Sequence, residues 1–135
     1  MKIAKPAFLL LTIALITLSG CTDKSKLLLK TWKVENLKYT EKVPEEMQQQ
    51  IDRSVAEIRN SFRLTYNADG TYNTESNGQV LKGTWKLNWN STSLTSTSDK
   101  GDSKTYKILD LAEDKFNFKA VEGKSEVIFE MVPAK

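Results

Sequence analysis

LKGTWKLNW, residues 81–89, alternates strictly between apolar and polar side chains. The positions of one parity carry apolar side chains or glycine: Leu81, Gly83, Trp85, Leu87 and Trp89. The positions between them are polar. Successive side chains of a β-strand point to opposite faces of its sheet, so this stretch predicts a strand with one dry face and one solvated face.

The same alternation recurs along most of the chain after residue 28 and is interrupted by short turn sequences. Asn-Gly and Asp-Gly pairs favour tight hairpins because both central residues tolerate positive φ. Turn pairs of this general kind are Asp69-Gly70, Asn77-Gly78, Asn90-Ser91, Lys100-Gly101, Glu113-Asp114 and Glu122-Gly123. The stretches between them predict eight strands, at about residues 30–40, 61–67, 71–76, 80–89, 92–98, 103–111, 114–121 and 124–132.

The alternation slips by one residue at Glu35-Asn36 and again at Ile108-Leu109, which predicts a β-bulge at each place. A long meander with one apolar face must hide that face and also its two free edges. Closing the sheet on itself hides both. We therefore expect a mainly β protein, an eight-stranded antiparallel up-and-down barrel. A two-layer sandwich is the alternative.

Residues 43–61 lack the alternation and follow helical spacing instead. Their apolar residues fall on one narrow stripe of a helix: Met47, Ile51, Val55 and Ile58. Pro44 suits a first helical position, and Arg59 near the end matches the helix dipole. The segment predicts one helix of about 16 residues between the first and second strands. We expect it to plug one end of the barrel with its stripe as ordinary core; a lid over a cavity is the alternative.

The 135-residue chain contains one cysteine and no histidine, and its length suits one domain with a single core. Zinc, copper and haem sites lose their usual ligands in such a chain, so no metal and no cofactor is expected. Histidine, the usual proton carrier near neutral pH, is missing, and no serine or threonine has an evident base partner. We therefore predict no catalytic residues and no enzymatic activity.

The first 21 residues have the features of an export signal. Lys2 and Lys5 precede an uncharged apolar stretch at residues 7–18, which is shorter than the about 20 residues of a membrane-spanning helix. Leu18-Ser19-Gly20-Cys21 follows and resembles the lipobox of bacterial lipoproteins. That resemblance implies a lipoprotein signal peptide at residues 1–20 and acyl chains on Cys21. A transmembrane anchor with an incidental cysteine is the alternative.

Acyl chains on Cys21 would tether the protein to a membrane, because each buried CH₂ contributes about 0.8 kcal/mol. Residues 21–27 would then be the lipidated cysteine and a short tether, and residues 28–135 the barrel domain. Thr22 stands where some Gram-negative lipoproteins carry a retention Asp, which by analogy favours the outer membrane. We expect a lipid-anchored protein of the cell envelope, facing either the periplasm or the exterior.

The charge of the domain is nearly balanced. Two of the chain's 20 basic residues, Lys2 and Lys5, lie in the signal, which leaves 18 basic against 17 acidic side chains. Both signs are intermingled, as at Lys33 and Glu35. Phosphate binding needs clustered positive charge, so we expect no nucleic-acid partner.

Five motifs follow one another along the domain: LLKTWKV at 28–34, NADGTY at 67–72, GTWKL at 83–87, YKILDL at 106–111 and DKF at 114–116. Their order and spacing resemble the bacterial lipocalin-like lipoprotein families of the calycin group. Lys30 departs from the pattern, since glycine often stands two residues before the first Trp. The resemblance implies a lipocalin-like barrel with capacity for a small apolar ligand, which it does not identify.

The aromatic side chains are the candidates for a ligand site. Trp32 and Trp85 resemble barrel-end residues that pack the floor, and we expect them to be structural. Tyr66, Tyr72 and Trp89 lie near the ends of predicted strands, where a cavity would open. Each combines an apolar ring with a polar tip, which suits a ligand site. Core packing is the alternative for all three.

Two functions agree with these features. The first is a membrane-anchored protein that binds a small hydrophobic or amphipathic ligand. The second is an envelope protein that docks on another protein or is purely structural, with a filled barrel core. A cavity opening beside Tyr66 or Trp89 would favour the first function, and a packed interior with an exposed apolar patch would favour the second.

Overall fold

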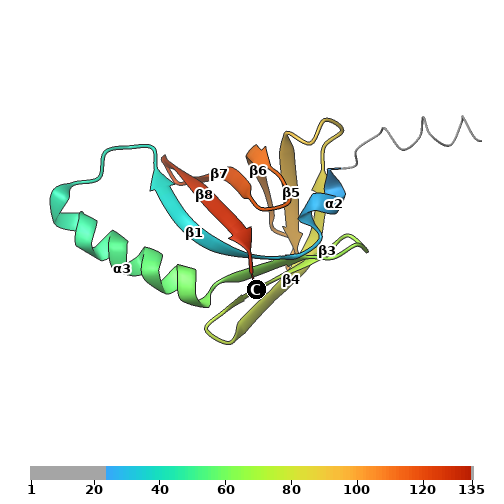
Figure 1. The fold of residues 1–135 in the computed structure, drawn as a ribbon, viewed down its shortest axis with the longest axis horizontal. Helices are drawn as coiled ribbons and strands as arrows, with labels where there is room; N and C mark the ends of the chain where they lie inside the picture. Colours follow the sequence, from blue (N-terminus) through green and yellow to red (C-terminus); the bar gives the residue numbers. More distant parts are fainter. Residues whose placement is uncertain (1–23, 135) are drawn as a thin grey trace, which may run out of the picture.

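The computed structural model describes residues 24–134 as a closed β-barrel (Figure 1). Each strand pairs antiparallel with the next, and the last strand pairs with the first. The strands are β1 (Thr31–Tyr39), β2 (Arg63–Tyr66), β3 (Thr71–Ser76), β4 (Gln79–Leu87), β5 (Ser93–Ser98), β6 (Ser103–Leu111), β7 (Phe116–Glu122) and β8 (Ser125–Pro133). The prediction of an eight-stranded up-and-down barrel is confirmed, and the sandwich alternative is wrong.

The order of the strands gives the barrel two distinct ends. Odd-numbered strands all begin at one end, which we call the floor, and even-numbered strands all finish there. The floor carries the β2–β3, β4–β5 and β6–β7 loops. The opposite end, which we call the mouth, carries the β3–β4, β5–β6 and β7–β8 hairpins.

The floor is closed by a short helix and a tryptophan. α2 (Ser25–Leu28) immediately precedes β1, and it begins within residues 21–27, where a tether was expected. Leu28 and Trp32 are both fully buried, and the Trp32 indole Nε1 donates a 3.1 Å hydrogen bond to the Leu28 carbonyl. The Trp32 ring centroid lies 5.6 Å from that of Phe116. Trp32 therefore packs the floor, as the sequence predicted.

Both predicted bulges are present. The register of β1 on β8 shifts between Val34 and Asn36, and that of β6 on β7 shifts between Ile108 and Asp110. Each bulge restores the inward orientation of the apolar residues that follow it. An extra residue in one strand of a pair also bends the wall, as a closed sheet requires.

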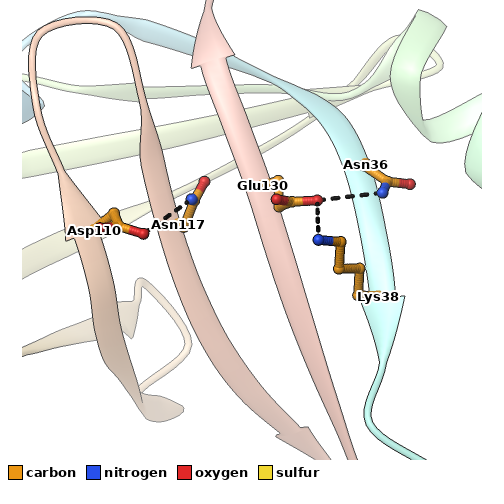
Figure 2. A network of polar contacts seen from close by, with 5 residues as sticks. All are labelled: Asn36, Lys38, Asp110, Asn117 and Glu130. Atoms are coloured by element: carbon orange, nitrogen blue, oxygen red, sulfur yellow. Dashed lines mark hydrogen bonds and ion pairs between the residues drawn. The ribbon is translucent and has the colours of Figure 1, made fainter.

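A row of polar side chains crosses four strands just beyond the bulges (Figure 2). In register, Asp110 pairs with Asn117, Asn117 with Glu130, and Glu130 with Asn36. Asn117 Nδ2 donates to Asp110 Oδ2 over 3.3 Å, and Asn36 Nδ2 donates to Glu130 Oε1 over 3.2 Å. Lys38 Nζ lies 3.4 Å from the same Glu130 oxygen. These contacts hold the shifted register on the outer face of the wall.

The helix between the first two strands, α3 (Glu45–Ser61), lies beside β1 and does not plug the barrel (Figure 1). None of its residues is buried, and Met47 is 49% exposed. Of the predicted stripe, Ile58 packs against the buried core. The plug prediction is wrong because β2 covers only the floor half of β1, which leaves the rest of β1 for the helix to lie against.

Gly83 allows unusually close contact between neighbouring strands. It pairs with Tyr72 on one side and with Ser98 on the other. A Cβ atom at Gly83 would collide with the Thr97 carbonyl oxygen and would lie 2.7 Å from Tyr72 Cε1 and 2.9 Å from Ser98 Cα. Two of these atoms are backbone, so neither can move without displacing β5.

Replacing Gly83 by alanine is therefore expected to lower the free energy of unfolding by about 1–3 kcal/mol, the usual cost of overpacking a well-packed wall. Urea denaturation followed by tryptophan fluorescence measures the change. Lys82→Ala is the matched control, because Lys82 is the exposed neighbour on the same strand, and surface changes usually stay within about 0.5 kcal/mol. Equal stability of the two variants would contradict the close contact.

Candidate functional site

A cavity of about 510 Å³ occupies the mouth half of the barrel. This volume is within the range of about 300–1,000 Å³ that is usual for small-molecule sites. Every strand from β2 to β8 contributes to its lining, together with Phe62 and the β5–β6 hairpin. The lining residues are Phe62, Leu64, Tyr66, Tyr72, Thr74, Leu81, Ser96, Ser98, Lys100, Asp102, Lys104, Tyr106, Phe118, Ala120, Val121 and Phe129.

Aromatic rings form a continuous column from the floor into this cavity. The Phe118 ring stacks on Phe129 with centroids 4.9 Å apart and planes within 5°. Phe118 also lies 5.1 Å from Tyr106 and 4.8 Å from Phe116, which in turn contacts Trp32 at the floor. Because these rings brace one another, the apolar wall of the cavity is formed in advance of any ligand.

Tyr66 lies where the packed core meets the cavity. Its side chain is only 3% exposed, and its ring centroid lies 5.4 Å from Trp85 and 6.4 Å from Tyr72. Ser96, another lining residue, hydrogen-bonds its hydroxyl group. The buried phenol is therefore fixed in place, with an apolar face toward the floor and a polar group toward the mouth.

Two tyrosines of the wall have perturbed acidity. Burial raises the pKa of Tyr66 above its ordinary value, and the nearby Tyr106 and Tyr72 raise it further. Burial also raises the pKa of Tyr72, with a second contribution from the negative charge of Asp99. Both side chains are therefore neutral phenols at physiological pH, suited to donating hydrogen bonds.

The polar lining residues gather toward the mouth. Lys104 pairs with Ser96 in register on the cavity side of the wall, and Lys100 and Asp102 come from the adjoining hairpin. Ser98 adds a hydroxyl group one step nearer the mouth than Ser96. The cavity is thus apolar at its base and polar at its opening.

The structure places the three candidate residues differently. Tyr66 and Tyr72 both line the cavity. Trp89 does not: it is 93% exposed, in the β4–β5 loop at the floor end. The prediction that Trp89 lies at a cavity mouth is therefore wrong. The alternation continues through it in the sequence, but β4 ends at Leu87 because Asn88 hydrogen-bonds into the following turn.

Trp85 contacts both the floor of the barrel and the base of the cavity. Its indole Nε1 donates a 3.2 Å hydrogen bond to the Asn67 carbonyl, in the β2–β3 loop at the floor. Its ring meets Tyr66 edge to face. Trp85 therefore joins the floor loop to the base of the cavity, which agrees with a structural role.

Several lining residues were not singled out in the sequence. Phe118 and Phe129 belong to the alternating apolar set, so their inward orientation was predictable but their position in the cavity was not. Lys104 shares the inward parity of Tyr106, yet a lysine in an alternating strand is ordinarily assigned to the solvated face. The exception arises because this end of the wall lines an open mouth.

Cys21 and the signal segment 1–20 lie outside the described residues. Within residues 24–134, no group of three or more His, Cys, Asp and Glu side chains is arranged to hold a metal ion. In the same part of the chain, no helix has both the length and the apolar character needed to cross a bilayer.

Two further hollows lie between α3 and β1, with volumes of about 460 and 550 Å³. Charged side chains, such as Lys33, Glu35 and Arg59, contribute to the smaller one. Both hollows are more open to solvent than the barrel cavity, and neither shares its aromatic wall. The interior cavity is therefore the candidate ligand site.

Comparison with known proteins supports the fold. No protein-family model matches the chain, and neither does any curated protein sequence. Among solved structures, the barrel is similar to the crystal structure of a DUF4847 family protein from Bacteroides vulgatus ATCC 8482, determined at 1.00 Å resolution. The TM-score is 0.58 at 16% sequence identity, over 83% of this chain and 97% of that chain. At this identity the likeness concerns the fold alone.

The buried Tyr66 phenol predicts a loss of stability at high pH. An unperturbed tyrosine ionises at a pKa of about 10, so above that pH the unfolded chain loses this proton while the folded chain keeps it. The stabilising effect of the raised pKa is complete below about pH 10 and declines as the pH rises further.

Between about pH 10 and 11, the wild-type protein is expected to lose about 1 kcal/mol more stability than Tyr66→Phe, which has no proton to lose at this position. Chemical denaturation of both proteins across this interval measures the difference, and other titrating groups cancel in the comparison. Identical pH dependence of the two proteins would show that Tyr66 ionises normally.

Proposed function

We propose that the protein is a membrane-anchored, lipocalin-like lipoprotein that binds a small hydrophobic or amphipathic ligand without catalysing a reaction. The observation that carries this proposal is the cavity of about 510 Å³ with its aromatic wall and polar mouth. Acylation of Cys21 would retain the domain at the cell envelope, with the outer membrane as the proposed location.

The distribution of side-chain size supports ligand binding over a filled core. The fully buried large side chains lie toward the floor and include Trp32, Phe116 and Leu94. Inward positions nearer the mouth carry small residues instead, such as Ser98 and Ala120. A purely structural barrel would gain stability from larger apolar side chains at these positions, so the space favours an occupant.

The gradient of polarity supports an amphipathic ligand. Phe118 and Phe129 offer stacked apolar surface at depth, whereas Lys100 and Lys104 lie at the opening. An apolar group can enter the barrel while a polar group stays among the hydroxyl and amine groups of the mouth. The ligand would then be oriented by its own polarity.

The chemical properties of Tyr66 and Ser96 favour ligand binding without catalysis. Burial raises the pKa of Tyr66, so its phenol keeps its proton and no phenolate is available to act as a base. The Ser96 hydroxyl group, which hydrogen-bonds this phenol, would need a neighbouring base to become a nucleophile, and a neutral phenol is not such a base. We therefore assign these two residues to ligand orientation.

Docking on another envelope protein is the second candidate function. α3 favours it, because no side chain of this 17-residue helix is fully buried. A partner protein in place of a small molecule would be the expected finding if docking were the main role.

Native mass spectrometry of the protein purified from its own envelope tests the proposal. The wild-type protein is expected to carry a stoichiometric small molecule. Thr74→Phe is expected to lose most of it, because Thr74 lines the cavity and the larger ring fills the space. The matched control is Asn73→Phe, at the neighbouring, outward-facing position of β3.

Retention of the small molecule by Asn73→Phe and its loss from Thr74→Phe would support the proposal. Equal retention by both variants would place the ligand outside the barrel. A wild-type protein that carries only a co-purifying protein would favour the docking function instead.

A further inference from the structure

Trp89 has the largest exposed fraction of the exposed large apolar side chains in residues 24–134, at 93%. Tryptophan buries 150–250 Å² when it is packed, so leaving it in water forgoes a substantial gain. The other two tryptophans show the usual behaviour, since Trp32 is fully buried and Trp85 is partly buried. Tryptophan is enriched at interfaces, because its ring is apolar and its N–H is polar.

The loop that carries Trp89 is tightly structured. Asn88 Oδ1 accepts hydrogen bonds from the backbone N–H groups of Thr92 and Ser93, over 2.8 and 3.0 Å. Asn88 Nδ2 donates to Asn90 Oδ1 over 2.7 Å and to Thr92 Oγ1 over 2.9 Å. Thr92 Oγ1 in turn donates to Asn90 Oδ1 over 2.8 Å. This network closes the turn and holds Trp89 in solvent, so its exposure is built into the fold.

Trp89 lies at the same end of the barrel as the start of the chain. β4 finishes at the floor and β1 begins there, so the β4–β5 loop and α2 share this end (Figure 1). Lys24 is the first described residue, and Cys21 precedes it by three residues. Three extended residues span at most about 11 Å, so acyl chains on Cys21 keep the floor close to the lipid.

We propose that the floor end rests on the membrane surface, with Trp89 at the lipid–water interface and the mouth opening away from the bilayer. This orientation rests on the acylated Cys21 of the proposed function. Tryptophan is the side chain most suited to the interface, where its ring meets acyl chains and its N–H meets head groups.

The charges of the floor are mixed. Lys24 precedes α2 and Lys26 lies within it, and Lys30 donates to the Glu113 carbonyl in the β6–β7 loop, which also carries Asp114. A surface with both signs does not require anionic lipid. The partner is therefore a phospholipid surface, whose boundary between acyl chains and head groups suits the Trp89 ring and its N–H. Neutral phosphatidylcholine is a sufficient probe.

The exposed apolar residues of the mouth are too far from the anchor to share this role. Leu81 and Val121 are 60% and 68% exposed and belong to the cavity rim. Nine-residue strands tilted as in small barrels separate the two ends by about 20 Å. That distance exceeds the reach of the tether, so one end alone can lie on the bilayer.

The test uses the full-length protein, made in a bacterial host, purified from its membranes and reconstituted into phosphatidylcholine vesicles with brominated acyl chains. Bromine quenches an indole that lies close to it. The wild-type fluorescence is expected to be quenched clearly more than in unbrominated vesicles, and Trp89→Phe to lose more than half of that quenching. The matched control adds Val121→Trp to Trp89→Phe, which moves the exposed indole to the mouth and should not restore quenching.

Mass spectrometry of the N-terminal peptide from the same sample separates the two proposals. If Cys21 is acylated but the wild-type protein is quenched no more than Trp89→Phe, the orientation is overturned and the anchor is left intact. Quenching restored by Val121→Trp would place the mouth on the membrane and also overturn it. An unmodified Cys21 would refute the anchor of the proposed function and the orientation with it.

Discussion

Pairing between the first and last strands is the constraint on which the rest of the structure depends. β1 and β8 pair from Trp32 opposite Pro133 to Tyr39 opposite Val127, which joins segments almost at opposite ends of the domain. This pairing removes both free edges of the sheet and makes one face an interior. Without it, the alternation of side chains would define two faces but enclose no space.

Closure alone does not produce a cavity, because an eight-stranded barrel is narrow enough to be filled by its own side chains. The uneven distribution of residue size produces it. Large rings crowd the floor around Trp32 and Phe116, whereas Ser98 and Ala120 take inward positions nearer the mouth. The packed floor supplies the stability, and the aromatic column extends that rigidity into the wall of the open half.

The strands and both bulges could be predicted because period-two alternation is a local property of the sequence. The slip at Glu35-Asn36 is visible in the sequence and reappears as the register shift after Val34. The existence of α3 was likewise predictable from its stripe. Its position was not, because a stripe identifies the apolar face of a helix but not the surface that receives it. That surface arises from the shortness of β2, a matter of pairing between distant segments.

The candidate site was only half predictable for a similar reason. Tyr66 and Tyr72 share the inward parity of confirmed strands and line the cavity. Trp89 continues the same alternation in the sequence, but β4 ends before it, because the Asn88 side chain accepts hydrogen bonds from the backbone of the following turn. Alternation therefore indicates which way a side chain points only as far as the strand continues. Hydrogen bonds made by side chains in the loop decide where the strand ends. These bonds leave no periodic pattern in the sequence.

The number of strands decides that β1 begins and β8 ends at the same end of the barrel. In an up-and-down barrel with an even number of strands, the chain enters and leaves at the same end, and here Ala134 N donates to the Thr31 carbonyl over 2.9 Å. Any N-terminal tether is then attached to the floor, and any opening at the other end is as far from it as the fold permits. Topology alone therefore puts the opening of the cavity and the start of β1 at opposite ends of the barrel. Side chains of the floor loops, such as Trp89, change the surface of that end, but they cannot exchange the two ends.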